Sequence, residues 1–240
     1  MKLLIIRHGD PDYEHDSLTE NGFAEAELLA KRIAPMKPKD IYCSVLGRAK
    51  ATAEPTLKAL GMKAEYCEWL REFNYAKIDL PYLRDKIPWD ILPSFIEKHP
   101  KVFEKDGWRE CDFIKSSDLA EYYDDVCREF DRVLESHGYK REGSTYKVTD
   151  SNHDVLAFFC HYGLGSVLIS HLFNCSPYVL WQQTVLLPTS VTEFVTEERE
   201  EGRASMRCRY LGDISHLYKF GREPSFSGRF CECFNDADRH

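Results

Sequence analysis

Arg7, His8 and Gly9 follow directly on the apolar run Leu3-Leu4-Ile5-Ile6. A short buried strand ending there would bring a guanidinium and an imidazole to its carboxyl end, where α/β folds bind their ligands. Arg presents a planar fork of donors that suits phosphate, and His can act as a nucleophile near neutral pH. Gly lets the backbone turn and come close to a ligand. The triplet therefore points to an anion site, provided that other parts of the chain complete it.

Three further side chains follow predicted strands in the same way: Arg48, Glu72 and His161. Two arginines and two histidines form a cationic pocket suited to a phosphoryl group, whose transfer demands mainly positioning and charge stabilisation. A carboxyl group of raised pKa at the rim could protonate the leaving oxygen. The strands that must position these residues are predicted over 2–6, 40–44, 64–69 and 155–160.

Each of these residues also has a structural interpretation. A histidine at a strand end is often only packed or solvated, and this holds for both His8 and His161. Arg48 opens a predicted helix, where a cation is unfavourable unless an anion is near, so a functional role is favoured. Glu65 and Glu68 lie close to Glu72, and spacing alone does not decide which of the three points inward.

Strands that alternate with helices predict an α/β fold. We expect a three-layer sandwich with a mainly parallel central sheet, helices on both faces, and the site along the carboxyl edge of the strands. Helical periodicity, bounded by proline and glycine, predicts helices over residues 23–33, 49–60, 117–136 and 163–173. Strand-like patterns predict two later strands over residues 191–196 and 205–210.

Changes in composition and in hydrophobic pattern along the chain predict one domain over residues 1–221. Within it, proline-punctuated aromatic and charged residues over about 79–150 predict a helical and loop insertion above the site, with a polar stretch from 138 to 152. The segment 222–240 carries Pro, Ser and Gly and is predicted to be a loosely docked or disordered tail.

Composition limits the classes of partner. The 240 residues are 43% hydrophobic and 30% charged, enough for a proper core in a soluble protein. The net charge of −8 disfavours nucleic acid and anionic membranes as partners. Residues 1–6 are too short for a signal peptide and are expected to form a core strand. No apolar run approaches the length of a membrane span.

Nine cysteines, an odd and scattered set, suit reduced thiols in a cytoplasmic protein. Cys231 and Cys233 are the one closely spaced pair, and without a second pair of ligands they do not favour a zinc site. The sequence leaves the oligomeric state and the role of these two cysteines open.

Five motifs in series resemble the histidine phosphatase superfamily, which has the phosphoglycerate-mutase-like fold. They cover most of the chain outside the insertion and the tail. The motifs are Arg7-His8-Gly9, Leu18-Thr19-x-x-Gly22-x-x-x-Ala26, Ser44-x-Leu46-x-Arg48-Ala49-x-x-Thr52-Ala53, Leu70-x-Glu72 and His161-x-Gly163.

The resemblance implies roles for the catalytic candidates. His8 would be the nucleophile that accepts the phosphoryl group, and Arg7, Arg48 and His161 would hold the phosphate oxygens. Glu72 would donate a proton to the leaving group and then help to activate water. Family members of this kind need no metal or other cofactor. The expected activity is a metal-independent phosphatase acting on a small phosphorylated metabolite.

The chain departs from the mutase branch after Gly9. That branch continues with Ser or Thr and then an aromatic residue followed by Asn, whereas this chain continues Asp10-Pro11-Asp12-Tyr13-Glu14. Asp10 and Asp12 either add negative charge to the site or point away from it. Tyr162 stands where a small residue or Asn is common and could narrow the pocket, and we expect Tyr13 and Tyr162 to contribute to substrate binding.

Three alternatives remain beside the metabolite phosphatase: a phosphoglycerate mutase-type transferase, a phosphoprotein phosphatase, and a non-catalytic binder of phosphorylated ligands. The presence of both His8 and Glu72 disfavours the last. Loops over a site carry specificity, so exposed-looking residues of the insertion are candidates for substrate contacts, although packing or solvation is an alternative for each. These candidates are Tyr75, Lys77, Arg84, Trp89, Trp108 and Arg109.

Overall fold

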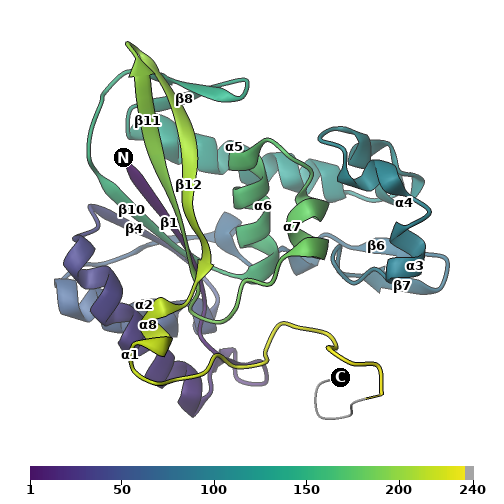
Figure 1. Ribbon diagram of the computed structural model, residues 1–240, viewed down its shortest axis with the longest axis horizontal. Helices are drawn as coiled ribbons and strands as arrows, with labels where there is room; N and C mark the ends of the chain where they lie inside the picture. Colours follow the sequence, from purple (N-terminus) through teal and green to yellow (C-terminus); the bar gives the residue numbers. More distant parts are fainter. Residues whose placement is uncertain (236–240) are drawn as a thin grey trace.

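An eight-stranded mixed sheet runs through the centre of the computed structural model, which describes residues 1–235 (Figure 1). Its strands are β1 (Lys2–Arg7), β4 (Asp40–Ser44), β5 (Glu65–Cys67), β8 (Tyr139–Glu142), β9 (Thr145–Val148), β10 (Val155–Cys160), β11 (Val191–Glu200) and β12 (Arg203–Asp213). They are ordered β5-β4-β10-β1-β11-β12-β9-β8. The first four of these run parallel, and the remaining strands pair antiparallel. The predicted fold class is confirmed.

Helices cover both faces of this sheet. The α-helices are α1 (Glu20–Ile33), α2 (Gly47–Leu60), α3 (Pro93–Ile96), α4 (Asp112–Lys115), α5 (Leu119–Ser136), α6 (Tyr162–Phe173), α7 (Pro177–Gln183) and α8 (Ser215–Tyr218). The 3₁₀ turns are η1 (Ala34–Met36), η2 (Glu68–Leu70), η3 (Phe73–Tyr75), η4 (Pro100–Phe103) and η5 (Gly107–Glu110). Two short hairpins pair β2 (Pro11–Asp12) with β3 (Ser17–Leu18), and β6 (Ile78–Leu80) with β7 (Leu83–Lys86).

The alternation of side chains along β1 explains the three layers. Leu4 and Ile6 face the core that α1 and α2 cover, whereas Leu3 and Ile5 face the core that α5 and α6 cover. Successive strand residues point to opposite faces, so a strand that is apolar at every position must be covered on both. The run Leu3–Ile6 therefore dictates a buried central strand.

The pairing of β1 with β10 sets the geometry of the site. The two strands are parallel, with Arg7 opposite Cys160. The next residues are His8 and His161, and the backbone N–H of His8 still donates to the carbonyl of Cys160 (2.9 Å). Two histidines far apart in the chain are thereby delivered to the same point on the carboxyl edge of the sheet.

Residues 138–152 differ from expectation in that they contain two strands. β8 and β9 form a hairpin that extends the central sheet beside β12. Charged residues alternate there with Tyr139 and Tyr146, which are fully buried. The alternation of buried and exposed positions, which is typical of a strand, was hard to recognise in the sequence because charged residues surround the two tyrosines. The helix α5 packs on the central sheet, with Phe130 in edge contact with Phe158 (5.3 Å between centroids).

Among residues 1–235, none of the helices combines the length and the apolar character that crossing a bilayer requires. The predicted boundaries of the domain, of the insertion and of the tail stay predictions.

The aromatic packing on β10 should carry a large share of the stability. Phe158 is fully buried and stacks on Tyr42 (5.1 Å between centroids). Phe158→Ala should lower the free energy of unfolding by about 3–5 kcal/mol, because it removes buried apolar surface and leaves a cavity. Urea unfolding followed by far-UV circular dichroism measures this. Phe23→Ala on α1, where the ring is 47% exposed, is the matched control and should cost about 1 kcal/mol or less. Equal losses would contradict the assigned core.

Candidate active site

The rings of His8 and His161 lie side by side at the ends of β1 and β10, with centroids 5.1 Å apart. Both residues are buried. Arg7 comes from the end of β1, Arg48 from the first turn of α2, and Glu72 from the loop after η2. The structure therefore brings together the five residues that the sequence selected for chemistry.

Hydrogen bonding defines the tautomer of His8. Its Nδ1 lies 2.7 Å from the backbone carbonyl of Gly9, and a carbonyl can only accept, so Nδ1 carries the proton. Burial, followed by the charges of Arg7 and Arg48, holds the pKa of His8 well below its usual 6.5. The ring is therefore neutral near pH 7, and its lone pair is on Nε2, ready to attack an electrophile.

Loop contacts fix the position of His8. The backbone N–H of Gly9 donates to the hydroxyl of Thr52 (2.9 Å), and the N–H of Asp10 donates to the carboxyl group of Glu25 (2.9 Å). The Thr52 hydroxyl in turn donates to the carbonyl of Arg48 (2.7 Å). The loop after β1 is thereby joined to α1 and α2, and these bonds fix the backbone beside His8 relative to that of Arg48.

Arg7 is a buried cation without an acidic partner. Its guanidinium donates to the backbone carbonyls of Leu186 and Ser227, and its Nε has no hydrogen-bond partner among the described residues. No carboxylate of residues 1–235 lies within ion-pair distance of it. Burial lowers the pKa of Arg7 from its usual value. A buried charge held only by neutral groups is costly, and an anion bound beside it would offset that cost.

Arg48 has an anion beside it in the structure. Its Nη1 lies 2.6 Å from Oδ1 of Asp16, in the hairpin that β2 and β3 form, and Asp16 also accepts from the backbone N–H of Gly47 (2.6 Å). The carboxylate of Asp16 therefore satisfies an N-terminal backbone donor of α2 and also pairs with the Arg48 cation. Negative charge is favourable at the positive end of a helix dipole. Nε of Arg48 is buried and has no hydrogen-bond partner in the described part of the chain, so part of its guanidinium fork remains available.

His161 caps the same cluster. Its Nε2 lies 2.8 Å from the hydroxyl of Ser44, which ends β4, and its Nδ1 is buried without a partner among the described residues. Burial lowers the pKa of His161 well below its usual value, and the neighbouring His8 and Arg48 add to the effect. A ligand that reached Nδ1 would satisfy a buried polar atom that the protein leaves unpaired.

Glu72 is the acidic side chain of the group. Its Oε1 accepts backbone N–H bonds from Phe73 (2.8 Å) and Leu164 (3.1 Å). Burial raises the pKa of Glu72 above its usual 4.5, although these donors and the charge of Arg48 oppose the rise. A Cβ on Gly163 would stand 2.2 Å from the Trp89 ring and 2.8 Å from Oε1 of Glu72. Glycine at that position therefore allows Trp89 and Glu72 to pack against the start of α6.

The other two acidic candidates of this segment point elsewhere. Glu65 lies in the edge strand β5 and is exposed. Glu68 is 75% exposed and pairs loosely with Arg71 (3.7 Å). Burial against the site thus distinguishes Glu72 from its neighbours.

A cavity of about 470 Å³ opens above these groups. Its size suits a small molecule. Tyr13 and Tyr162, which the sequence predicts to contribute to substrate binding, both line it. The Tyr13 ring lies near the guanidinium of Arg48 (5.5 Å) and the Tyr162 ring near that of Arg7 (6.0 Å). The full lining is Arg7, Tyr13, Arg48, Glu72, Asn74, Ile87, Trp89, Tyr162, Gly228, Arg229 and Phe230.

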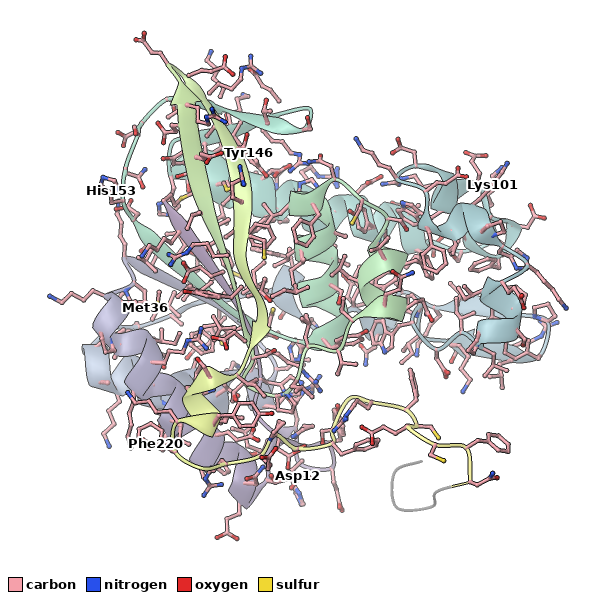
Figure 2. The ribbon with its side chains drawn as sticks, in the orientation of Figure 1. Asp12, Met36, Lys101, Tyr146, His153 and Phe220 are labelled. Atoms are coloured by element: carbon pink, nitrogen blue, oxygen red, sulfur yellow. The ribbon has the colours of Figure 1, made fainter. Side chains whose placement is uncertain are left out.

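Asp10 and Asp12 do not extend into the cavity. Asp12 lies 2.8 Å from His15 within its own hairpin (labelled near the lower end of Figure 2). Asp10 accepts hydroxyl bonds from Thr19, Ser225 and Ser227. Burial alone would raise the pKa of Asp10, but these donors outweigh it and the pKa is lowered.

Of the six insertion residues considered for substrate contacts, Trp89 lines the cavity. Trp108 is 1% exposed and packs against Tyr123 (5.2 Å between centroids), and Arg109 forms a bidentate pair with Asp124. The remaining three lie elsewhere on the surface: the Tyr75 ring meets the Tyr122 ring edge to face, Lys77 is exposed, and Arg84 is 87% exposed.

Three lining residues come from the tail, which the sequence predicts to be loosely docked or disordered, and residues 225–230 make specific contacts with the rest of the chain. Ser225 and Ser227 bond to Asp10, and Gly228 lies against the guanidinium of Arg7. Ser225 and Ser227 gave no sequence signal for docking, because their partner is the single carboxylate of Asp10, far away in the chain. Residues 236–240, the end of the predicted tail, lie outside the described residues.

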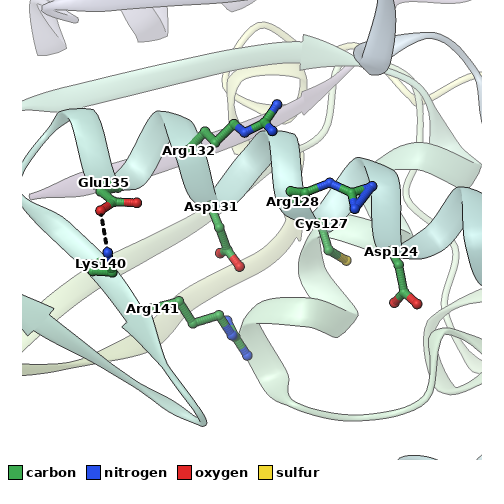
Figure 3. A pocket seen from close by; sticks show the side chains of 8 residues that line it. All are labelled: Asp124, Cys127, Arg128, Asp131, Arg132, Glu135, Lys140 and Arg141. Atoms are coloured by element: carbon green, nitrogen blue, oxygen red, sulfur yellow. Dashed lines mark hydrogen bonds and ion pairs between the residues drawn. The ribbon is translucent and has the colours of Figure 1, made fainter.

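A second groove, beside α5, lacks such a constellation (Figure 3). Its charges are matched within the protein: Glu135 pairs with Lys140 (2.8 Å), and Arg141 bonds to Asn174 (2.6 Å). Nor do three or more His, Cys, Asp or Glu of residues 1–235 lie where they could jointly hold a metal ion.

A family model described as histidine phosphatase superfamily (branch 1) matches residues 3–208. The chain belongs to the histidine phosphatase superfamily. This confirms the predicted family and the assignment to a family of phosphatase enzymes. A probable phosphatase of Schizosaccharomyces pombe is 24% identical over 234 residues, covering 90% of this chain and 95% of that protein.

Solved structures show the same fold. A phosphoserine phosphatase of Entamoeba histolytica, in complex with 3-phosphoglyceric acid, is 18% identical with a TM-score of 0.58, over 90% of this chain and 98% of that one. A mycobacterial glucosyl-3-phosphoglycerate phosphatase, in complex with VO3, is 18% identical with a TM-score of 0.55, over 88% and 98%.

Proposed function

We propose that this histidine phosphatase superfamily member is a metal-independent phosphatase, which hydrolyses a small phosphomonoester through a phosphohistidine on His8. The observation that carries the proposal is a neutral imidazole with its Nδ1 proton held by Gly9, beside buried guanidinium and imidazole nitrogens that have no hydrogen-bond partner within residues 1–235. Such a site is preorganised for an anion bearing an electrophilic centre.

In the first step, Nε2 of His8 would attack phosphorus as the bond from phosphorus to the ester oxygen breaks. Glu72, whose pKa burial raises, would give a proton to the departing oxygen. Arg7, Arg48 and His161 would hold the three other oxygens, whose charge is spread in the transition state. The products of this step are an alcohol and phosphorylated His8.

In the second step, water would attack the phosphoryl group while the Glu72 carboxylate takes a proton from it. The P–N bond to His8 then breaks, and inorganic phosphate leaves. The same carboxyl group thus acts first as acid and then as base.

The cavity volume and the relatives support a small substrate. About 470 Å³ accommodates a phosphorylated metabolite, and the named functions of two solved relatives concern phosphoserine and glucosyl-3-phosphoglycerate. Five cysteines are buried as free thiols, which fits a reducing compartment such as the cytoplasm: Cys43, Cys67, Cys111, Cys127 and Cys160.

His8→Ala should lower kcat/KM for p-nitrophenyl phosphate by about a thousandfold or more, because it removes the nucleophile. Activity in the parent should persist in EDTA. After rapid denaturation during turnover, mass spectrometry should find one phosphoryl group on the peptide containing His8. The matched control is His153→Ala. His153 is an exposed histidine, labelled at the upper left of Figure 2, and the variant should keep parental activity. Equal rates in the parent and His8→Ala, or complete loss in EDTA, would reject the mechanism.

Supplying 3-phosphoglycerate separates the phosphatase from a mutase. Release of inorganic phosphate supports the proposal, and formation of the 2-isomer without phosphate release contradicts it.

The role of Glu72 makes a prediction about pH. His8 must be neutral, so the rate falls as pH drops through its lowered pKa. Glu72 must be protonated, so the rate with an alkyl phosphate falls as pH rises through its raised pKa. Glu72→Gln should lower kcat by about 10²–10⁴ for an alkyl phosphate and remove the alkaline limb. The loss should be smaller with p-nitrophenyl phosphate, whose leaving group needs no proton.

Glu68→Gln is the control for this experiment, since Glu68 is 75% exposed and should leave the profile unchanged. The ionisation of the substrate itself is common to all variants. An alkaline limb that persists in Glu72→Gln would exclude Glu72 as the acid.

A further inference from the structure

Gly228, Arg229 and Phe230 of the tail line the cavity, and the residues just before them attach the tail to the loop after β1. Oδ1 of Asp10 accepts from the hydroxyls of Ser225 (2.5 Å) and Ser227 (2.7 Å), and the carbonyl of Ser227 accepts from Nη1 of Arg7 (3.3 Å). In Figure 1 this segment leaves α8 and runs across the lower side of the molecule. The loop that carries the nucleophile therefore also anchors the tail.

Gly228 determines how closely the tail approaches. It has φ +86°, and a Cβ there would stand 2.4 Å from Nη2 of Arg7. Only a residue without a side chain meets both conditions easily. The contact with Arg7 directs the next two residues, Arg229 and Phe230, to the cavity wall.

Arg229 has donors to spare. Its side chain is 25% exposed, its guanidinium lies over the ring of Phe226 (4.2 Å), and Glu232 pairs with Nη1. Its Nε is buried with no hydrogen-bond partner among the described residues. The edge of a guanidinium that contains Nε matches the two oxygens of a carboxylate.

Arg229 is not one of the residues that mark the phosphoryl end of the cavity. Arg7, Arg48 and Glu72 mark that end, because they act electrostatically on the two histidines or on each other. Arg229 lines the same cavity from the tail, together with Phe230, and Trp89 of the insertion lines it as well. A cation in this part of the lining would be available to the group that carries the phosphate.

We propose that Arg229 is a specificity-determining residue, which binds a carboxylate on the substrate's leaving group. The preferred substrates would be phosphorylated hydroxy acids or amino acids. This inference rests on the proposed phosphatase function. It also assigns a purpose to the tail: the hydroxyls of Ser225 and Ser227 hold Arg229 in place through Asp10.

Two substrates that differ in one group test the inference: 3-phosphoglycerate, with a carboxylate, and glycerol 3-phosphate, with a hydroxymethyl group at that carbon. The discrimination ratio is kcat/KM for the first divided by kcat/KM for the second. The parent should favour 3-phosphoglycerate. Arg229→Ala should reduce the ratio by about tenfold or more, mainly through KM, because a charge-assisted pair is lost. Arg229→Lys should give an intermediate ratio, since it keeps the charge without the fork.

Arg222→Ala is the matched control, because this tail arginine bonds to Asn21 (2.9 Å) outside the cavity; it should keep the parental ratio. The double variant Ser225→Ala/Ser227→Ala should reproduce the lowered ratio by releasing the tail, while the backbone carbonyl of Ser227 is retained. Continued hydrolysis of glycerol 3-phosphate shows that each variant is folded.

The outcomes separate the two proposals. A parent that hydrolyses both esters but whose ratio is unchanged in Arg229→Ala keeps the phosphatase and overturns the role of Arg229. Equal losses on both esters in that variant also overturn it, since they indicate a structural effect. A parent that hydrolyses no phosphomonoester overturns the proposed function itself.

Discussion

The parallel pairing of β1 with β10 is the interaction on which the site depends. With Arg7 opposite Cys160, the next residue of each strand is a histidine, and the two rings lie 5.1 Å apart. A slip by one residue would turn each side chain to the other face of the sheet. The apolar residues of β1 and β10 are buried on both faces, so such a slip would also expose core side chains. Packing of the core therefore fixes the geometry of the chemistry.

Burial of positive charge is the second constraint. Arg7 is 3% exposed and Arg48 8%, and burial, together with their charges, keeps the neighbouring imidazoles neutral. Asp16 offsets part of this charge at Arg48, whereas the partners of Arg7 within residues 1–235 are the backbone carbonyls of Leu186 and Ser227. The fold holds these cations in place through well-packed surroundings, and a bound anion would relieve the remaining cost. The same low-polarity surroundings raise the pKa of Glu72, so one physical cause shifts the pKa of both His8 and Glu72 in the direction that their proposed roles require.

Much of this could be predicted from sequence because it depends on local patterns. Apolar runs predicted β1 and β10, and parallel strands share a carboxyl edge, so His8 and His161 could be placed together before any coordinates. Asp16 was missed since its contact with Arg48 depends on a hairpin turn, where Asp16 itself has φ 46°. β8 and β9 were missed because charges mask their alternation.

The tail could not be predicted for a different reason. Its docking depends on Asp10, which lies more than two hundred positions earlier and whose hydroxyl partners look like ordinary linker residues. The composition of a segment indicates whether it can fold by itself, but it does not reveal a contact with one distant carboxylate such as that of Asp10. Trp89, in contrast, was one of six aromatic and charged candidates for substrate contacts. Its packing against Gly163, which the sequence does not reveal, places it at the cavity and so distinguishes it from the other five.

The most direct test of the central claim is a crystal structure with orthovanadate, which mimics a phosphoryl group under attack. The account predicts five-coordinate vanadium with Nε2 of His8 at one apex and with Arg7, Arg48 and His161 around its equatorial oxygens. Vanadate bound elsewhere, or His8 turned away from it, would contradict the account.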